Sequence, residues 1–122
     1  MKKLYLAYGS NLNLGQMAQR CPTAMVLGAA QLNGWRLTFR GFDGGAVANI
    51  EQEKESEVPV LIWELEPADE EALDIYEGFP FLYRKVMVTV VFEGKPIEAM
   101  AYIMVRHVRN LKGYAQSRLK IK

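Results

Sequence analysis

The pattern of hydrophobic and polar residues predicts that the chain begins with a strand, a turn and a helix. An alternating apolar run over 3–8 ends at Gly9, which is typical of a strand followed by a turn. Over 13–20 the apolar residues recur at i, i+3 and i+4. This spacing predicts a short helix whose N-cap is Asn11 or Asn13.

Several strands are expected after this helix. The segment 24–39 is rich in strand-forming residues but is broken by two glycines, which predicts one long strand with bends or two strands. The segment 42–50 reads as a turn followed by a short strand. A further strand is predicted over 59–65, with Pro59 at its start.

A second helix and a hairpin complete the predicted elements. The helix falls within 66–79, with Pro67 in its first turn and Gly78 just beyond its end. The segment 83–105 reads as two strands joined at 93–96, and the remainder is weakly helical. Because strands and helices do not alternate regularly, a doubly wound parallel sheet is disfavoured. We expect one α+β domain over 1–122 with a mixed, strongly curved sheet or small barrel and flanking helices.

Composition narrows the classes of function. The chain has 122 residues, a net charge of +1, one cysteine and one histidine. This charge gives no overall attraction to nucleic acid or to a membrane surface, and no apolar stretch approaches the roughly 20 residues of a membrane helix. No small-residue cleavage site follows the first apolar run, so no signal peptide is expected. A lone cysteine, Cys21, fits a reducing compartment, and the cytoplasm is the expected location.

The sequence predicts neither a metal nor a cofactor. Common zinc sites need three or four Cys and His ligands, which one cysteine and one histidine cannot supply. Neither GxGxxG nor GxxxxGK[ST] occurs, so the dinucleotide-binding and P-loop interpretations lack their main support.

Charged residues are unevenly distributed. Eleven of the fourteen acids lie between Glu51 and Glu77, and the segment from Arg106 onward has six Lys or Arg and no acid. One interpretation is an acidic loop and helix face with a solvated basic tail; another is a basic patch for nucleic acid or a partner. The tail lacks the interleaved aromatic residues typical of single-strand binding, which favours the first.

Glu77 is unusual for its position in the predicted second helix. It falls in the last turn, one residue before Gly78, where the helix dipole presents about half a negative charge. It also lies four residues after Leu73, which places it toward the interior. Dipole and desolvation would raise its pKa above the ordinary value of about 4.3, and such a carboxyl can act as a general acid or base. The alternative is a surface residue hydrogen-bonded to a loop or paired with Arg84 or Lys85.

The turn at Tyr8-Gly9-Ser10-Asn11 is a candidate anion site. A turn between a strand and a helix start presents several backbone N–H groups in one concavity, and such groups bind carboxylates or phosphates. Gly9 permits close approach, and Ser10 and Asn11 add polar contacts. Together with a separate general base, this loop could handle a small zwitterionic substrate.

Several segments in order make the chain resemble the γ-glutamylcyclotransferase-like proteins. They are YGSNLN after the first strand, RCP at the end of the first helix, GGAVANI, VLIWEL and LDIYEGFPFLYRKVMVTV. The resemblance spans roughly 4–105. It implies a small curved sheet or barrel, a cavity for the substrate, and catalysis by Glu77. The substrate-binding residues implied, the last two of which are alternatively core aromatics, are Tyr8, Gly9, Ser10, Asn11, Leu12, Tyr83 and Tyr102.

The implied reaction is an intramolecular aminolysis. The α-amine of a γ-glutamyl compound attacks its own γ-carbonyl, closes 5-oxoproline and expels the attached amine or amino acid. Holding the folded conformer can contribute about 7 to 11 kcal/mol. One carboxylate can take the ammonium proton and return it to the leaving nitrogen, while loop amides bind either the α-carboxylate or the oxyanion.

Two departures from the family pattern leave alternatives open. Asn49 stands where a Thr is more common, which would alter the pocket wall. The segment after Val105 lacks the expected proline, so the site is either more open or borrows a wall from a second subunit in a homodimer. A non-catalytic binding module with the same fold is the main rival, and a nucleic-acid or partner-binding tail ranks third. A nucleophilic Cys21–His107 pair has nothing in the sequence to bring the two residues together.

Overall fold

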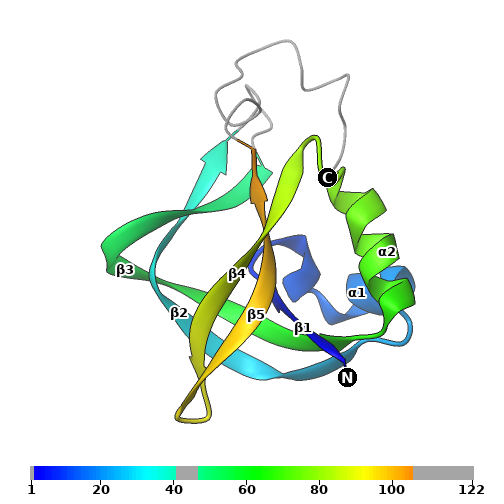
Figure 1. Cartoon of the computed structure of the whole chain (residues 1–122), viewed down its shortest axis with the longest axis horizontal. Helices are drawn as coiled ribbons and strands as arrows, with labels where there is room; N and C mark the ends of the chain where they lie inside the picture. Colours follow the sequence, from blue (N-terminus) through cyan, green and yellow to red (C-terminus); the bar gives the residue numbers. More distant parts are fainter. Residues whose placement is uncertain (1, 41–46, 106–122) are drawn as a thin grey trace.

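The strands curve into a closed five-stranded barrel with the order β1-β3-β2-β4-β5 around its wall (Figure 1). The computed structural model describes residues 2–40 and 47–105. All neighbouring strands are antiparallel except β1 and β5, which are parallel. This confirms the predicted α+β fold with a mixed, curved sheet. In chain order the elements are β1 (Lys3–Ala7), the 3-10 helix η1 (Ser10–Leu12), α1 (Leu14–Arg20), β2 (Met25–Arg40), β3 (Val47–Leu65), α2 (Pro67–Glu77), β4 (Tyr83–Phe92) and β5 (Lys95–Met104).

The long strands β2 and β3 form most of the barrel wall. β2 is a single strand with irregular pairing between Val26 and Gly28 and again between Asn33 and Trp35. Of the two predicted alternatives, one long strand with bends or two separate strands, the first is therefore observed. Such irregularities let a strand bend sharply enough for a small sheet to close.

The predicted boundaries of β3 were wrong. Instead of a short strand near Ile50 and another starting at Pro59, one strand of 19 residues runs from Val47 to Leu65 and includes the acidic stretch expected to be a loop. Pro59 lies inside it, opposite Gln31 of β2. β1 pairs with β3 only as far as Leu61, so β1 does not flank Pro59. A proline is tolerated where one edge of a strand is open.

Two apolar clusters lie on opposite faces of the barrel wall. The odd residues 99, 101 and 103 of β5 belong to the cluster that contains Leu6 and Leu32, whereas the even residues 100, 102 and 104 belong to the cluster that contains Met17 and Leu73. Met17 and Leu73 come from the two helices, so the second cluster lies between helices and wall. This period of two places alternate residues of each strand on the two faces.

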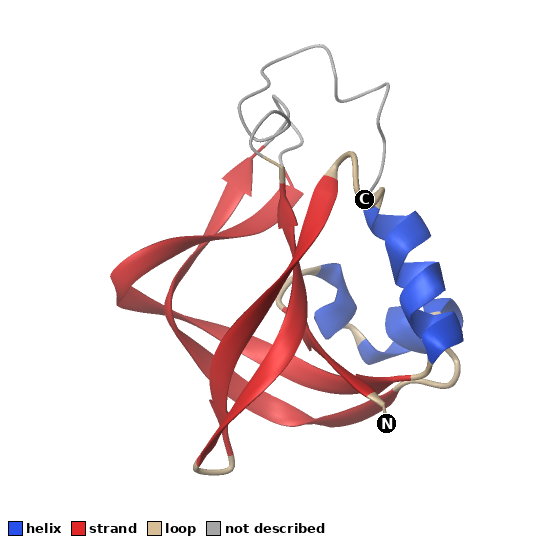
Figure 2. Ribbon diagram, in the orientation of Figure 1, coloured by secondary structure: helices blue, strands red, loops and turns tan. Residues whose placement is uncertain are grey.

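Both helices lie on the same side of the barrel, as Figure 2 shows. α1 begins at the predicted N-cap Asn13, whose Oδ1 accepts a hydrogen bond from Gln16 N. α2 begins with Pro67, and its end is closed by Gly78, which adopts a left-handed conformation (φ 69°). The helix therefore stops at Glu77, as predicted.

The remaining predictions concern the hairpin and the tail. β4 and β5 pair from Tyr83↔Met104 to Phe92↔Lys95 around the turn Glu93-Gly94, which confirms the hairpin. The weakly helical segment 109–122, the basic tail and His107 lie outside the described residues. No helix in the described ranges is long and apolar enough to cross a membrane.

Candidate functional site

A cavity of about 150 Å³ lies where the first loop, the end of α2 and the wall of the barrel meet. Its residues come from β1, the loop that follows it, η1, the beginning of β3, the last residue of α2, and β5. Segments far apart in the sequence are thus brought together by closure of the barrel. The described lining residues are Tyr5, Tyr8, Gly9, Ser10, Asn11, Val47, Ala48, Glu77 and Tyr102.

Glu77 is the charged residue among the described lining residues. It is the last residue of α2 and only 5% exposed. Leu73, one turn earlier on the same helix face, is completely buried. The helix end and the inward face predicted from the sequence are therefore both observed. The end of α2 therefore places a buried carboxyl group at the cavity.

The loop before α1 forms one wall of the cavity. Leu12 N donates to Gly9 O (2.9 Å) and Asn13 N donates to Ser10 O (3.0 Å), which folds the loop into a 3-10 turn. Among backbone hydrogen bonds between described residues, none uses the amide of Ser10 or Asn11 as donor. These two N–H groups lie at the start of the turn and are available to an anionic group.

A ring of contacts fixes this loop against α2. Ser10 Oγ and Tyr76 Oη lie 2.8 Å apart, and the Arg20 guanidinium lies 3.6 Å from the centroid of the Tyr76 ring. Arg20 also donates a short hydrogen bond to Asn11 Oδ1. Since Tyr76 precedes Glu77, these contacts link the loop directly to the end of α2 that carries the carboxylate.

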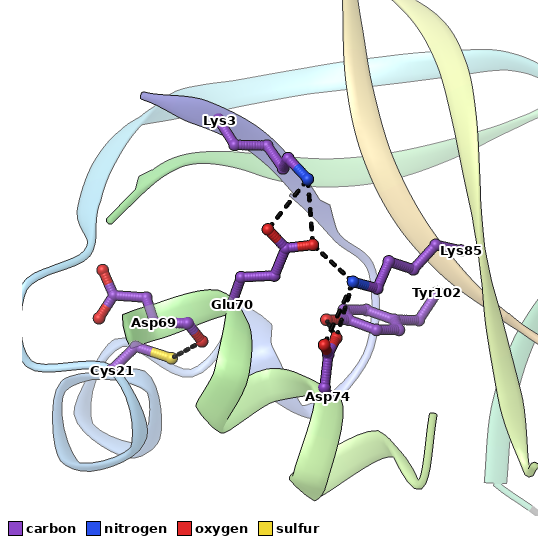
Figure 3. Close-up of polar contacts among 7 residues, drawn as sticks. All are labelled: Lys3, Cys21, Asp69, Glu70, Asp74, Lys85 and Tyr102. Atoms are coloured by element: carbon purple, nitrogen blue, oxygen red, sulfur yellow. Dashed lines mark hydrogen bonds and ion pairs between the residues drawn. The ribbon is translucent and has the colours of Figure 1, made fainter. Parts of the chain in front are cut away.

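A cluster of charged residues fixes α2 to the barrel (Figure 3). Glu70 accepts from Lys3 of β1 (3.1 Å) and forms an ion pair with Lys85 of β4. Lys85 also lies 3.0 Å from Asp74 Oδ1. Because Glu70 and Asp74 are four residues apart, they present one face of α2 to these lysines. Lys85 was one predicted alternative partner of Glu77, but in the structure it pairs with Glu70 and Asp74 instead.

Tyrosine hydroxyls connect the walls of the cavity. Tyr8 Oη donates to Tyr102 O (2.6 Å), which joins the loop to β5, and Tyr102 Oη donates to Asp74 Oδ1 (2.6 Å). Burial, followed by the nearby carboxylate of Glu77, raises the pKa of Tyr5 and of Tyr83 above the ordinary value. These phenols are therefore protonated near neutral pH. Tyr83 Oη donates to Ala48 O, whereas Tyr5 Oη accepts from Asn11 Nδ2.

Most of the predicted site residues lie together. Tyr8, Gly9, Ser10, Asn11 and Tyr102 line the cavity with Glu77.

Two predicted residues do not line the cavity. Leu12 is 39% exposed on the outer side of the turn. Tyr83 is 1% exposed, and its hydroxyl donates to Ala48 O (2.9 Å), so it supports the residue that forms the wall. This is the alternative role as a core aromatic. Both residues stand in the segments that carry the resemblance, but neither is among the described lining residues.

Three lining residues were missed by the sequence analysis: Tyr5, Val47 and Ala48. Tyr5 lies on the alternating first strand, and alternation alone does not tell which face of β1 meets a cavity. Val47 and Ala48 are 39 and 40 residues after Tyr8 in the printed sequence, at the beginning of β3. Only the path of β3 around the barrel brings them to the site.

Asn49 and Cys21 have structural surroundings. Asn49 is 1% exposed, and its Oδ1 accepts from Met104 N (2.9 Å), which ties β3 to β5. Asn49 is not among the described lining residues, so the expected change to the pocket wall is not observed there. Cys21 is buried, and burial, assisted by Asp69, raises the pKa of its thiol to about 11. No group of three potential His, Cys, Asp or Glu metal ligands occurs within the described part of the chain.

Comparison with known proteins places this chain in a family. The sequence profile of the family Gamma-glutamyl cyclotransferase, AIG2-like matches residues 5–119. Proteins named Gamma-glutamylcyclotransferase from Mus musculus and Homo sapiens are each 32% identical over 113 residues. These alignments cover 85% of this chain and 60% of each relative, so the chain spans about 60% of the length of these curated relatives.

Solved structures share the same fold. One named Gamma-glutamyl cyclotransferase has a TM-score of 0.79 and 29% identity, and the match covers 86% of this chain and 68% of the other. A Homo sapiens protein has a TM-score of 0.78 and 30% identity with the same coverage. With a family profile that spans nearly all of the sequence and a matching barrel, the chain belongs to the γ-glutamyl cyclotransferase, AIG2-like family.

Proposed function

We propose that this chain is a γ-glutamyl cyclotransferase, which releases 5-oxoproline and a free amine or amino acid from a γ-glutamyl compound. The observation that carries the proposal is the placement of the buried carboxylate of Glu77 in the same cavity as the Tyr8–Asn11 loop. The named relatives support the same reaction. A small cavity with a few convergent polar groups is also the usual form of a small-molecule site.

In the proposed mechanism, the substrate supplies its own nucleophile. Glu77 takes a proton from the α-ammonium group, and the resulting amine attacks the γ-carbonyl carbon. A new C–N bond closes the five-membered ring, and Glu77 returns the proton to the leaving nitrogen as the original amide C–N bond breaks. The second proton that the ring nitrogen must lose is then taken by Glu77 and passed to the released amine, which leaves as an ammonium ion. Atoms and charges balance without a covalent enzyme intermediate, and the enzyme contributes chiefly by holding the substrate in a folded conformer.

The loop supplies the anion-binding half of the proposed site. The Ser10 and Asn11 amides face the α-carboxylate or the oxyanion of the γ-carbonyl, where N–H groups fixed in advance are most effective. A Cβ at position 9 would lie 3.4 Å from the Ala48 Cβ, in van der Waals contact with the beginning of β3. A side chain at position 9 would thus narrow the space between the loop and β3.

The substrate class follows from what the cavity can contact. A volume of about 150 Å³ suits the γ-glutamyl half of a substrate. Dipeptides, γ-glutamylamines and glutathione-like peptides share that half, and we propose this class. The lone cysteine of the chain supports action in the cytoplasm. We also propose that a second subunit of a homodimer completes the cavity wall around the part of the substrate attached to the γ-glutamyl group.

The test is 5-oxoproline release from a panel of γ-glutamyl compounds. Each compound is paired with its α-linked isomer, which has no γ-amide to cleave, and with its N-acetylated form, which has no free α-amine to attack. We expect product only from the unmodified γ-linked compounds. Binding without product would support the non-catalytic module instead, and product from the acetylated form would contradict intramolecular attack.

A further inference from the structure

The hydrogen bonds of Asn11 have a direction that Arg20 determines. Asn11 is 2% exposed, and its side-chain amide contacts Arg20 on one side and Tyr5 on the other. A guanidinium group has only donors, so the atom of Asn11 that faces Arg20 must be the carbonyl oxygen. The NH₂ group must then face Tyr5, where Asn11 Nδ2 lies 2.9 Å from Tyr5 Oη.

This orientation decides the role of the Tyr5 hydroxyl. Because Asn11 donates to it, Tyr5 Oη acts as an acceptor in that contact, and its own hydrogen is directed elsewhere. Tyr5 is 3% exposed and lines the cavity together with Asn11. Among the hydrogen bonds between described residues, none has Tyr5 Oη as donor. The hydrogen is therefore available to an acceptor inside the cavity.

We infer that Tyr5 donates its phenolic hydrogen to a negatively charged oxygen of the bound substrate, and that Arg20, through Asn11, is the positioning residue that fixes this direction. The inference rests on the proposed function, because the oxygen belongs to a γ-glutamyl compound. Tyr5 would act on the γ-carbonyl oxygen as it becomes an oxyanion, from a strand rather than from the loop. A chain of hydrogen bonds that starts at a cation polarises each donor along it.

Other contacts agree with this assignment. The guanidinium of Arg20 is held by the Tyr76 ring, at 3.6 Å from its centroid, so the beginning of the relay has a fixed position. Both Tyr5 and Asn11 are almost completely buried, which keeps water from replacing either partner. Arg20 itself does not line the cavity. Its effect on the reaction must therefore pass through other residues.

The kinetic test is a double-mutant cycle with Tyr5→Phe and Arg20→Met, assayed with a γ-glutamyl compound that the wild type turns over. Tyr5→Phe should lower kcat by about 10²-fold, as expected when one donor to an oxyanion is removed, with a smaller change in KM. Arg20→Met should lower kcat by a smaller factor, and the double variant should be no slower than Tyr5→Phe alone, because both changes remove the same donor. Arg20→Lys, which retains a donor-only side chain, should recover part of the loss. Arg36→Met, an exposed arginine on β2, is the matched control.

Effects that multiply in the double variant, or a Tyr5→Phe enzyme with unchanged kcat, would overturn the inference. A second measurement does not depend on turnover. In wild type, the Asn11 side-chain NH₂ protons should show nuclear Overhauser effects to the Tyr5 ring, and Arg20→Met should weaken them because the amide can then rotate. Absence of these effects in wild type would overturn the relay. A wild type that shows them but releases no product would overturn the proposed function, and with it the donation to a γ-glutamyl oxygen, while the Arg20–Asn11–Tyr5 orientation would stand.

Discussion

Tyr102 donates its phenolic hydrogen to Asp74, with 2.6 Å between Oη and Oδ1. This bond joins β5, which forms a wall of the cavity, to α2, which carries Glu77 three residues further along. The ring of Tyr102 also packs edge-on against Tyr5, with centroids 5.9 Å apart. The position of the buried carboxylate relative to the cavity therefore depends on this contact between a strand and a helix.

Removing the Tyr102 hydroxyl should weaken both stability and catalysis. A hydrogen bond to a charged group contributes about 1.5 to 3 kcal/mol, and Asp74 is partly exposed, so Tyr102→Phe should lower the free energy of unfolding by about 1 kcal/mol. Displacement of α2 should also lower kcat/KM. Urea denaturation and steady-state kinetics measure the two effects. An unchanged unfolding midpoint would show that the contact does not anchor the helix.

Gly78 should be far less tolerant of substitution than Gly94. Both adopt positive φ, 69° and 80°, and a side chain in that region costs roughly 1 to 2 kcal/mol. At Gly78 a Cβ would also lie 2.7 Å from Leu82 Cδ1, whereas at Gly94 no described atom lies within 4 Å. Gly78→Ala should therefore lower the free energy of unfolding by more than Gly94→Ala. Equal losses in thermal or urea unfolding would contradict the role of Leu82.

The elements whose ends are marked by local sequence signals were predicted correctly. The path of β3, which depends on closure of the barrel, was not. Pro67, Gly78 and the Glu93-Gly94 turn mark boundaries by their own backbone preferences, so α2 and the β4–β5 hairpin were predicted correctly. The path of β3 through Pro59 has no local signal, because it depends on which edge of the strand lacks a partner.

The same distinction applies to the candidate site. The loop and Glu77 come from short motifs, and the structure places them around one cavity. Tyr5, Val47 and Ala48 reach the cavity only through the curvature of β1 and β3. Tyr83 belongs to a motif, yet its side chain points to Ala48 O because the alternation of β4 turns it toward the cluster beneath the helices.

The charged cluster on α2 should make stability depend on pH in the acidic range. Burial raises the pKa of Glu70, but the hydrogen bonds from Lys85 and Lys3 outweigh it, and the net result is a pKa below the ordinary value of 4.5. Since the folded pKa is the lower one, the stabilisation is present above about pH 4.5 and is lost as the pH falls through the folded pKa. The urea midpoint of wild type should exceed that of Glu70→Gln at pH 6, and the two midpoints should converge as the pH falls to 3.

Glu71→Gln is the control for this experiment, because Glu71 is exposed on the same helix. Its difference from wild type should be small at every pH. A gap between wild type and Glu70→Gln that stays constant down to pH 3 would contradict the assigned ion pairs.

Cys21 should be inert and dispensable for turnover. It is 1% exposed, and the pKa of its thiol is raised to about 11 by burial and then by Asp69. The thiolate needed for nucleophilic attack is thus scarce near neutral pH. Cys21→Ala should retain kcat, and a disulfide reagent should modify the native protein far more slowly than the urea-unfolded chain. Loss of turnover in a folded Cys21→Ala variant would revive a cysteine mechanism.

The central claim is that Glu77 moves the proton in a cyclisation that yields 5-oxoproline. The most direct measurement compares 5-oxoproline release by wild type and Glu77→Gln, with binding of the same γ-glutamyl compound measured for both. We predict a fall in kcat of at least about 10²-fold, as for loss of a general acid–base group, with binding retained. Turnover by Glu77→Gln at the rate of wild type would contradict the account.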